Sequence, residues 1–167
     1  MKSENTYLYS FKTILIMKNF QTVDEILDFA IENEQNAADF YFKLADITRD
    51  KSIRETFTLY ANEEIGHKEK LISIKKEGVF QLEEQSILDM KVADYVVRQA
   101  VFENMSYQDA LILAMKREKA AYRLYMKLSS KTDDKQFKDL FIGLAQEEAK
   151  HKMAFEIEYD NVILREN

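Results

Sequence analysis

The sequence predicts an all-α protein, a four-helix bundle made of two duplicated helical hairpins joined by a long crossover. Three observations lead to this prediction. The 167 residues include no proline and only 3 glycines, so little interrupts a helix, and strand-rich folds need more turn residues. Apolar side chains recur at helical spacing in four long stretches. The second half of the chain also repeats the first at a constant distance.

The first helix is expected to begin at Thr22 and to run to about Thr48. Thr22 and Glu25 form a capping box, in which a hydroxyl residue is followed three positions later by an acid. The inner stripe of this helix has a carboxylate at its centre. It reads Ala30, Glu34, Ala37, Tyr41, Leu44 and Thr48.

The second helix is expected to run from a capping box at Ser52 and Glu55 to about Glu77, with Gly78 as its C-terminal cap. Gly66 inside it costs roughly 1 kcal/mol relative to alanine. A close approach of another backbone beside His67 would explain this glycine, and so would neutral drift. The inner stripe contains a glutamate and a histidine three residues apart, and reads Ile53, Phe57, Tyr60, Glu64, His67, Leu71 and Ile74.

Val79–Met105 is expected to form the crossover, with a short helix across Glu83–Met90 and a second one near Val92 and Tyr95. Its length allows the chain to return along the whole bundle. Ser106 and Asp109 then form a third capping box, which predicts a helix to about Lys131. A fourth helix follows the connection Asp133–Asp134 and continues to Leu164. Their stripes read Ala114, Glu118, Ala121, Tyr125, Leu128, Thr132, and Phe137, Phe141, Leu144, Glu148, His151, Phe155.

The repeat places one lone glutamate and one Glu-x-x-His motif in each hairpin. The offset is 84 residues (118 minus 34, 148 minus 64 and 151 minus 67), and the chain's 2 histidines each close one motif. Taken singly, a Glu-x-x-His is an ordinary surface pair and a buried tyrosine a packing residue. Carboxylates on buried stripes are costly, by several kcal/mol per ion, unless they are paired, neutralised or bound to a cation. Four glutamates and two histidines at matching positions of the buried stripes therefore predict a two-metal site.

The predicted ligands are Glu34, Glu64, His67, Glu118, Glu148 and His151. The central pair, Glu64 and Glu148, is expected to bridge the two metals and, with Tyr41 and Tyr125, to take part in catalysis. The two tyrosines are expected to hydrogen-bond ligand carboxylates. Oxygen-rich ligation with one imidazole per metal favours two iron ions, with manganese as the alternative.

Composition excludes several classes of function. With no cysteine, the chain holds no disulfide, iron–sulfur cluster or rubredoxin-type iron centre. A net charge of -6 argues against nucleic-acid binding, and no apolar run is long enough to span a membrane. Residues 1–20 are interpreted as an N-terminal leader, in which Met17 is an alternative start, and 21–167 as the bundle domain. No targeting signal is evident, so the cytoplasm is the expected location.

The motifs resemble those of the rubrerythrin-type members of the ferritin-like superfamily. The resemblance covers roughly Thr22 to Tyr159. It depends on Glu34-x-x-Ala37-x-x-x-Tyr41, Glu64-x-x-His67 and their counterparts Glu118-x-x-Ala121-x-x-x-Tyr125 and Glu148-x-x-His151. The same set, a glutamate from two helices and Glu-x-x-His from two others, is described for di-iron and di-manganese bundles. The resemblance implies a di-iron site that reduces peroxide, or that oxidises ferrous iron as in ferritin branches.

Two departures from the rubrerythrin pattern and two from the ferritin branches refine the expectation. No cysteine-bearing rubredoxin domain follows the bundle, so electrons are expected from an external donor such as a rubredoxin or a reductase. Ala121 stands where rubrerythrins carry an extra glutamate that exchanges with a histidine during turnover, which puts that ligand switch in doubt. Ile65 replaces the methionine that binds haem in bacterioferritins. Too few residues follow His151 for the fifth helix of a ferritin storage cage.

The expected function is that of a non-haem di-iron oxidoreductase that reduces hydrogen peroxide or dioxygen. A ferroxidase or iron-handling protein, or a di-manganese protein, is the alternative within the same chemistry. A non-catalytic metal-binding or sensing module is an alternative from a different class. A homodimer is also expected, because the crossover is more apolar than a lone surface segment needs and relatives often dimerise. The apolar residues concerned are Val92, Tyr95, Val96 and Val101.

Overall fold

A computed structural model describes residues 19–97 and 105–166 and contains four long helices. These are α2 (Val23–Ile47), α3 (Lys51–Glu77), α5 (Tyr107–Lys131) and α6 (Lys135–Glu166). Between the second and third of them lie the short helix α4 (Glu84–Leu88) and the 3-10 turn η1 (Val92–Asp94). Within these two ranges there is no β-strand, and Asn19 forms an isolated bridge with Lys91. The predicted all-α bundle is confirmed.

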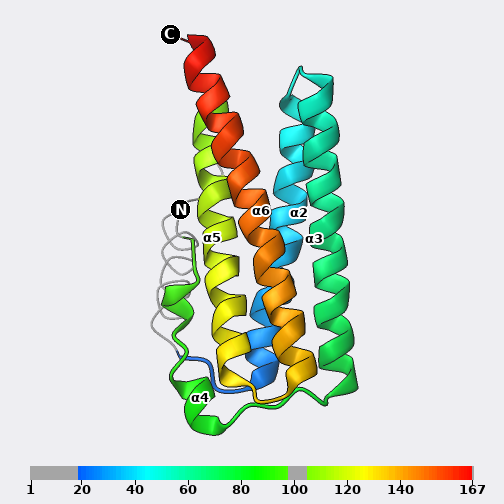
Figure 1. Cartoon of the computed structure of the whole chain (residues 1–167), viewed down its shortest axis with the longest axis vertical. Coiled ribbons are helices and arrows are strands. Elements are labelled where there is room, and N and C mark those ends of the chain that lie inside the picture. Colours follow the sequence, from blue (N-terminus) through cyan, green and yellow to red (C-terminus); the bar gives the residue numbers. More distant parts are fainter. Residues whose placement is uncertain (1–18, 98–104, 167) are drawn as a thin grey trace, which may run out of the picture.

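The four long helices form two antiparallel hairpins that lie side by side (Figure 1). α2 packs along α3 and α5 packs along α6, with further contacts between α2 and α5. The crossover leaves α3 at one end of the bundle, passes through α4 and climbs beside α5 toward the other end (Figure 1). α5 therefore begins at the end where α3 begins, as the predicted return along the bundle requires.

Side-chain caps fix three of the helix starts. Thr22 Oγ1 accepts a hydrogen bond from Glu25 N at 3.1 Å, and Ser106 Oγ accepts one from Asp109 N at 3.0 Å, as predicted. The predicted cap at Ser52 is wrong. Asp50 is the N-cap of α3, because its carboxylate accepts a hydrogen bond from Ile53 N at 3.1 Å, which leaves the serine inside the first turn.

The end of α3 and the glycine within it need separate explanations. Gly78 ends the helix in the left-handed conformation at φ 65°, as expected of a glycine cap. Apart from its own helix and its chain neighbours, no described atom would lie within 4 Å of a Cβ added at Gly66. A close backbone approach therefore does not explain this glycine.

The core consists of two apolar clusters, one in each half of the bundle. The cluster nearer the α4 end includes Ile26, Leu71, Leu128 and Phe141, and the cluster nearer the other end includes Tyr41, Phe57, Leu111 and Phe155. Six buried polar residues lie along the helices between these clusters; they are Glu34, Glu64, His67, Glu118, Glu148 and His151. The bundle thus has a charged layer across its middle.

The crossover contributes to the core nearer the α4 end. Phe80, Met90, Val92 and Tyr95 are all buried against it. Val92 and Tyr95 are therefore used within the chain and give no support to the predicted homodimer, while Val101 lies outside the described residues. The homodimer stays a prediction without this support.

Residues 1–18, which include most of the predicted leader and Met17, also lie outside the described residues. Phe20, next to them, is buried against the same core. No described helix combines the length and the apolar character needed to cross a membrane.

Candidate metal centre

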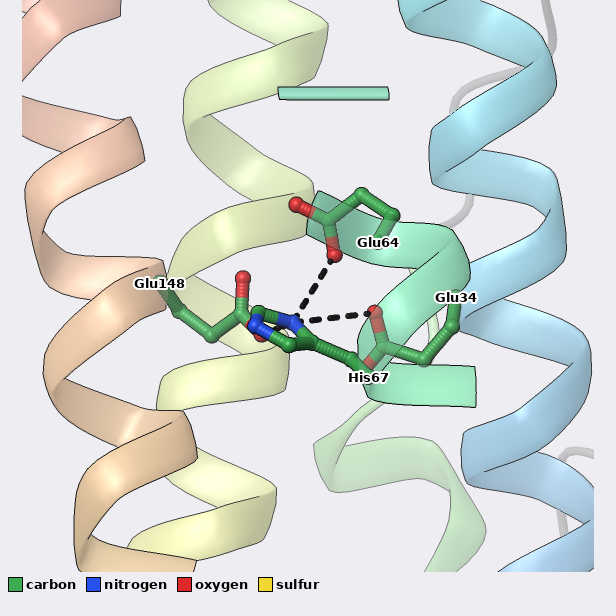
Figure 2. Close-up of side chains that lie close together, drawn as sticks. All are labelled: Glu34, Glu64, His67 and Glu148. Atoms are coloured by element: carbon green, nitrogen blue, oxygen red, sulfur yellow. Dashed lines mark ion pairs between the residues drawn. The ribbon is translucent and has the colours of Figure 1, made fainter. Parts of the chain in front are cut away.

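Four helices supply the six side chains of the charged layer. α2 supplies Glu34 and α5 supplies Glu118, while α3 and α6 each supply a Glu-x-x-His motif. None of the six residues is more than 2% exposed. Each lies on the inner stripe of its helix because residues three or four apart share one face. Figure 2 shows Glu34, Glu64, His67 and Glu148 converging from three of these helices.

The six residues form two overlapping groups. Glu34, Glu64, His67 and Glu148 offer ligand atoms within 4.8 Å of one another, and so do Glu64, Glu118, Glu148 and His151. Both central carboxylates belong to both groups, while one glutamate and one histidine belong to each group alone. This is the arrangement expected if Glu64 and Glu148 bridge two ions and the other residues each hold one.

Distances at the two imidazoles place both central carboxylates between the histidines. His67 Nδ1 lies 3.3 Å from Glu64 Oε2 and 3.1 Å from Glu148 Oε1. His151 Nδ1 lies 2.7 Å from Glu64 Oε1 and 3.7 Å from Glu148 Oε2. Each central carboxylate therefore presents one oxygen toward each histidine.

Among the residues that the structure describes, the inward-facing atoms have no hydrogen-bond partner. This holds for both carboxylate oxygens of Glu64 and Glu148 and for Nδ1 of His67 and His151. They approach one another at ion-pair distance without hydrogen-bond geometry. Leaving buried polar atoms unsatisfied costs about 1–3 kcal/mol each, and more for charged groups. A pair of cations bound at the centre would satisfy these atoms together, so the donor set fits metal ions.

Burial and mutual repulsion shift the acidity of the outer carboxyls. Burial is the largest effect on Glu34 and Glu118, and with the charge of Glu148 it raises the pKa of both carboxyls well above its usual range. Without a bound cation, the outer glutamates therefore hold protons. A positive ion would favour their ionised form.

The central groups have the opposite charge state. Burial alone would raise the pKa of Glu64, but the adjacent His151 and His67 outweigh it and hold the pKa well below its usual range. Burial alone would likewise lower the pKa of His151, but the carboxylates of Glu148 and Glu64 raise it to about 10. The pKa of His67 is raised for the same reason. Without a cation, protonated imidazoles therefore lie beside the ionised carboxylate of Glu64.

A carboxylate from the opposite hairpin bonds the outer nitrogen of each histidine. His67 Nε2 lies 2.7 Å from an oxygen of Glu147, and His151 Nε2 lies 2.7 Å from an oxygen of Glu63. A carboxylate that accepts the proton of Nε2 leaves Nδ1 as the metal-binding nitrogen and holds the ring in place. These two glutamates are not among the predicted site residues. Their signal in the sequence is that they match at the repeat offset and directly precede Glu64 and Glu148.

Two tyrosines bond the outer glutamates, also across the hairpins. The hydroxyl of Tyr41 donates to Glu118 Oε1, and that of Tyr125 donates to Glu34 Oε1. Both rings are fully buried. The hydrogen bonds expected between tyrosines and ligand carboxylates are therefore present, and each joins the two halves of the repeat.

The two half-sites differ around their matching ligands. The ring of Tyr60 lies 4.4 Å from that of His151, whereas the residue one repeat later is Leu144. Arg117 precedes Glu118, whereas the matching residue before Glu34 is Asn33. The two halves of the repeat therefore carry the same residues at the ligand positions and different residues at these two positions near them.

A pocket of about 150 Å³ reaches the charged layer between α2 and α5. Its lining includes four carboxylates of the layer, namely Glu34, Glu64, Glu118 and Glu148, and part of the crossover at Tyr95, Val96 and Val97. Neither histidine lines this pocket. Small molecules can therefore approach the cluster from its carboxylate side.

Comparisons with known proteins agree with this geometry. One similar solved structure is a hypothetical protein from Pyrococcus furiosus, with 25% identity and a TM-score of 0.66; the match covers 83% of this chain and 89% of that one. Another is a putative ferritin-like diiron-carboxylate protein from Thermotoga maritima, with 19% identity and a TM-score of 0.70; the match covers 86% of this chain and 97% of that one. No curated protein matches the chain. The family model described as rubrerythrin matches residues 25–159, most of the chain. The chain therefore belongs to the rubrerythrin family, as its motifs indicated.

Proposed function

We propose that the protein is a non-haem di-iron oxidoreductase that reduces hydrogen peroxide or dioxygen with electrons from an external donor. The observation that carries the proposal is the pair of overlapping ligand groups that share Glu64 and Glu148. Membership of the rubrerythrin family and the unsatisfied oxygens and nitrogens at the centre support it.

The residues of the site would hold two metal ions. Glu64 and Glu148 would bridge, Glu34 with His67 would complete one position, and Glu118 with His151 the other. Bound ferrous ions would supply two electrons, and hydrogen peroxide takes two electrons and two protons to give two water molecules. Four carboxylates favour the higher charge of the oxidised site.

The two tyrosines, together with Glu63 and Glu147, would keep this arrangement fixed. Tyr41 and Tyr125 place a hydroxyl proton at an oxygen of Glu118 and Glu34, which orients each carboxylate and leaves its second oxygen for metal. Glu63 and Glu147 hold the imidazoles and are partly exposed, so that they connect the histidines with solvent. A site held in this way reorganises little during the reaction.

The test is a single-turnover experiment on iron-loaded protein reduced without oxygen. Mixed with peroxide, it should oxidise once, stoichiometrically, and stop unless a rubredoxin and its reductase are added. Glu64→Ala should abolish the fast phase, because it removes a ligand of both positions. Glu69→Ala, on an exposed position of the same helix, should not.

Other outcomes would favour the alternatives. Faster reaction with dioxygen, sustained by excess ferrous ion with mineral formation, would indicate a ferroxidase. Oxygen release from peroxide by manganese-loaded protein would indicate a di-manganese enzyme. No reaction with either oxidant would contradict an oxidoreductase and favour a metal-binding or sensing module.

A further inference from the structure

The lining of the pocket between α2 and α5 includes three alanines in addition to the four carboxylates of the charged layer. These alanines are Ala37, Ala120 and Ala121. At about 150 Å³ it has room for several molecules of the size of water, each of which occupies about 30 Å³ in the liquid. The chamber itself is therefore not closely fitted to one small oxidant, and any discrimination by size must come from its mouth.

Arg117 lies across the boundary between the two helices that form this pocket. It projects from α5, and its Nη1 donates a hydrogen bond to the backbone oxygen of Asn36 on α2 at 3.3 Å. Its Cζ lies 4.6 Å from the centre of the Phe40 ring, also on α2. A planar guanidinium that stacks and hydrogen-bonds at once is held in one orientation.

The charge of Arg117 has no carboxylate partner among residues 19–97 and 105–166. The residue is half-buried and lines the pocket together with Glu118, although its own contacts are with a backbone carbonyl and an aromatic ring. A surface ion pair therefore does not explain its position. Asn33, the matching residue in the other hairpin, has a side chain too short to reach from one of these helices to the other in the same way.

Given the proposed function, we propose that Arg117 limits the size of the oxidant that enters, so that hydrogen peroxide and dioxygen pass and alkyl hydroperoxides do not. The side chain acts by spanning the mouth from α5 to α2, and it is a specificity-determining residue with no role in binding metal. Removing this side chain should widen the opening between the pocket and solvent.

The first test compares oxidants of different size on reduced, iron-loaded protein. Each hydroperoxide ROOH takes two electrons from the reduced site and two protons, and gives ROH and water. In Arg117→Ala, the rate with cumene hydroperoxide relative to hydrogen peroxide should rise at least about tenfold. Arg117→Lys keeps the charge but loses the planar stacking, and should show a smaller rise.

The matched control is Arg54→Ala. The guanidinium of Arg54 also bonds a backbone oxygen, that of Thr48 at 3.0 Å, but lies on the exposed surface away from the pocket. This variant should keep the wild-type ratio. An unchanged ratio in both Arg117 variants, or equal reaction of wild-type protein with both peroxides, would overturn the proposal.

The second test does not depend on activity. Protein loaded with cobalt(II) is titrated with imidazole and with the bulkier 4-phenylimidazole, both uncharged near pH 8, and binding is followed by the visible absorption of the metal. The bulky ligand should bind at least about tenfold more tightly to Arg117→Ala than to wild type, and imidazole should change less. Equal affinity of the bulky ligand for both proteins would overturn the proposal. If no peroxide reacts with wild type, the proposed function fails while this titration still tests Arg117.

Discussion

Each histidine of the cluster uses its two ring nitrogens for different purposes. Nδ1 faces the central carboxylates, and Nε2 bonds Glu147 or Glu63 on the opposite hairpin. Helical spacing placed the histidines on buried stripes from the sequence alone. It could not identify Glu63 and Glu147, because their pairing with the histidines depends on how one helix is rotated against another.

Glu63 and Glu147 should matter for metal affinity although they are not ligands. Glu147→Ala removes the acceptor of His67 Nε2, so the ring loses its fixed orientation and its nitrogen becomes less basic. We expect metal to bind about 10–100-fold more weakly at the position of His67. Competition titration with a chromophoric chelator measures this loss. Glu156→Ala, exposed on the same helix, is the control, and equal affinity in both variants would refute the role of Glu147.

Metal binding should release protons and weaken as the pH falls. In the metal-free protein the pKa of Glu34 and Glu118 is raised by burial, and that of His151 is raised to about 10 by the adjacent carboxylates. These shifts favour protonated forms whose protons a cation must displace, so affinity for metal should increase with pH. Titration with metal in weakly buffered solution, with a pH indicator, should show acidification. No proton release at pH 7 would contradict this charge state.

At the scale of the elements, sequence signals predicted the four long helices closely, since caps and apolar stripes are local. The exception is the start of α3, where Ser52 and Glu55 match the capping pattern but Asp50 forms the cap. Two neighbouring residues can satisfy the same rule, and only the path of the connecting turn decides between them. The crossover was predicted less sharply because its apolar residues follow the surface of the bundle and not a helical period.

Gly66 offers a test of helix energetics inside α3. Apart from its own helix and its chain neighbours, no described atom lies within 4 Å of an added Cβ, so Gly66→Ala should stabilise the protein by up to about 1 kcal/mol. Gly78→Ala should destabilise it by a similar amount, because Gly78 has a positive φ of 65°. Urea unfolding of both variants measures the two effects. Loss of stability in Gly66→Ala would show that the glycine is needed for a reason other than space.

At the scale of the whole molecule, the duplication explains why the site lies at the centre. Two hairpins with the same ligands, packed together, give a nearly symmetrical cluster in which every outer contact crosses between them. The repeat offset made this architecture predictable. The differences at Tyr60 and Arg117 were not predictable as functional features, because their meaning depends on the ring and the pocket that they contact.

The central claim is that this bundle holds two metal ions that share Glu64 and Glu148. Anaerobic titration with ferrous ion, followed by metal analysis after removal of free ion, tests it most directly. We expect two ions per chain in the wild type, about one in His67→Ala, and loss of both tight positions in Glu64→Ala. A single ion in the wild type, or two ions still tightly bound in Glu64→Ala, would contradict the shared site.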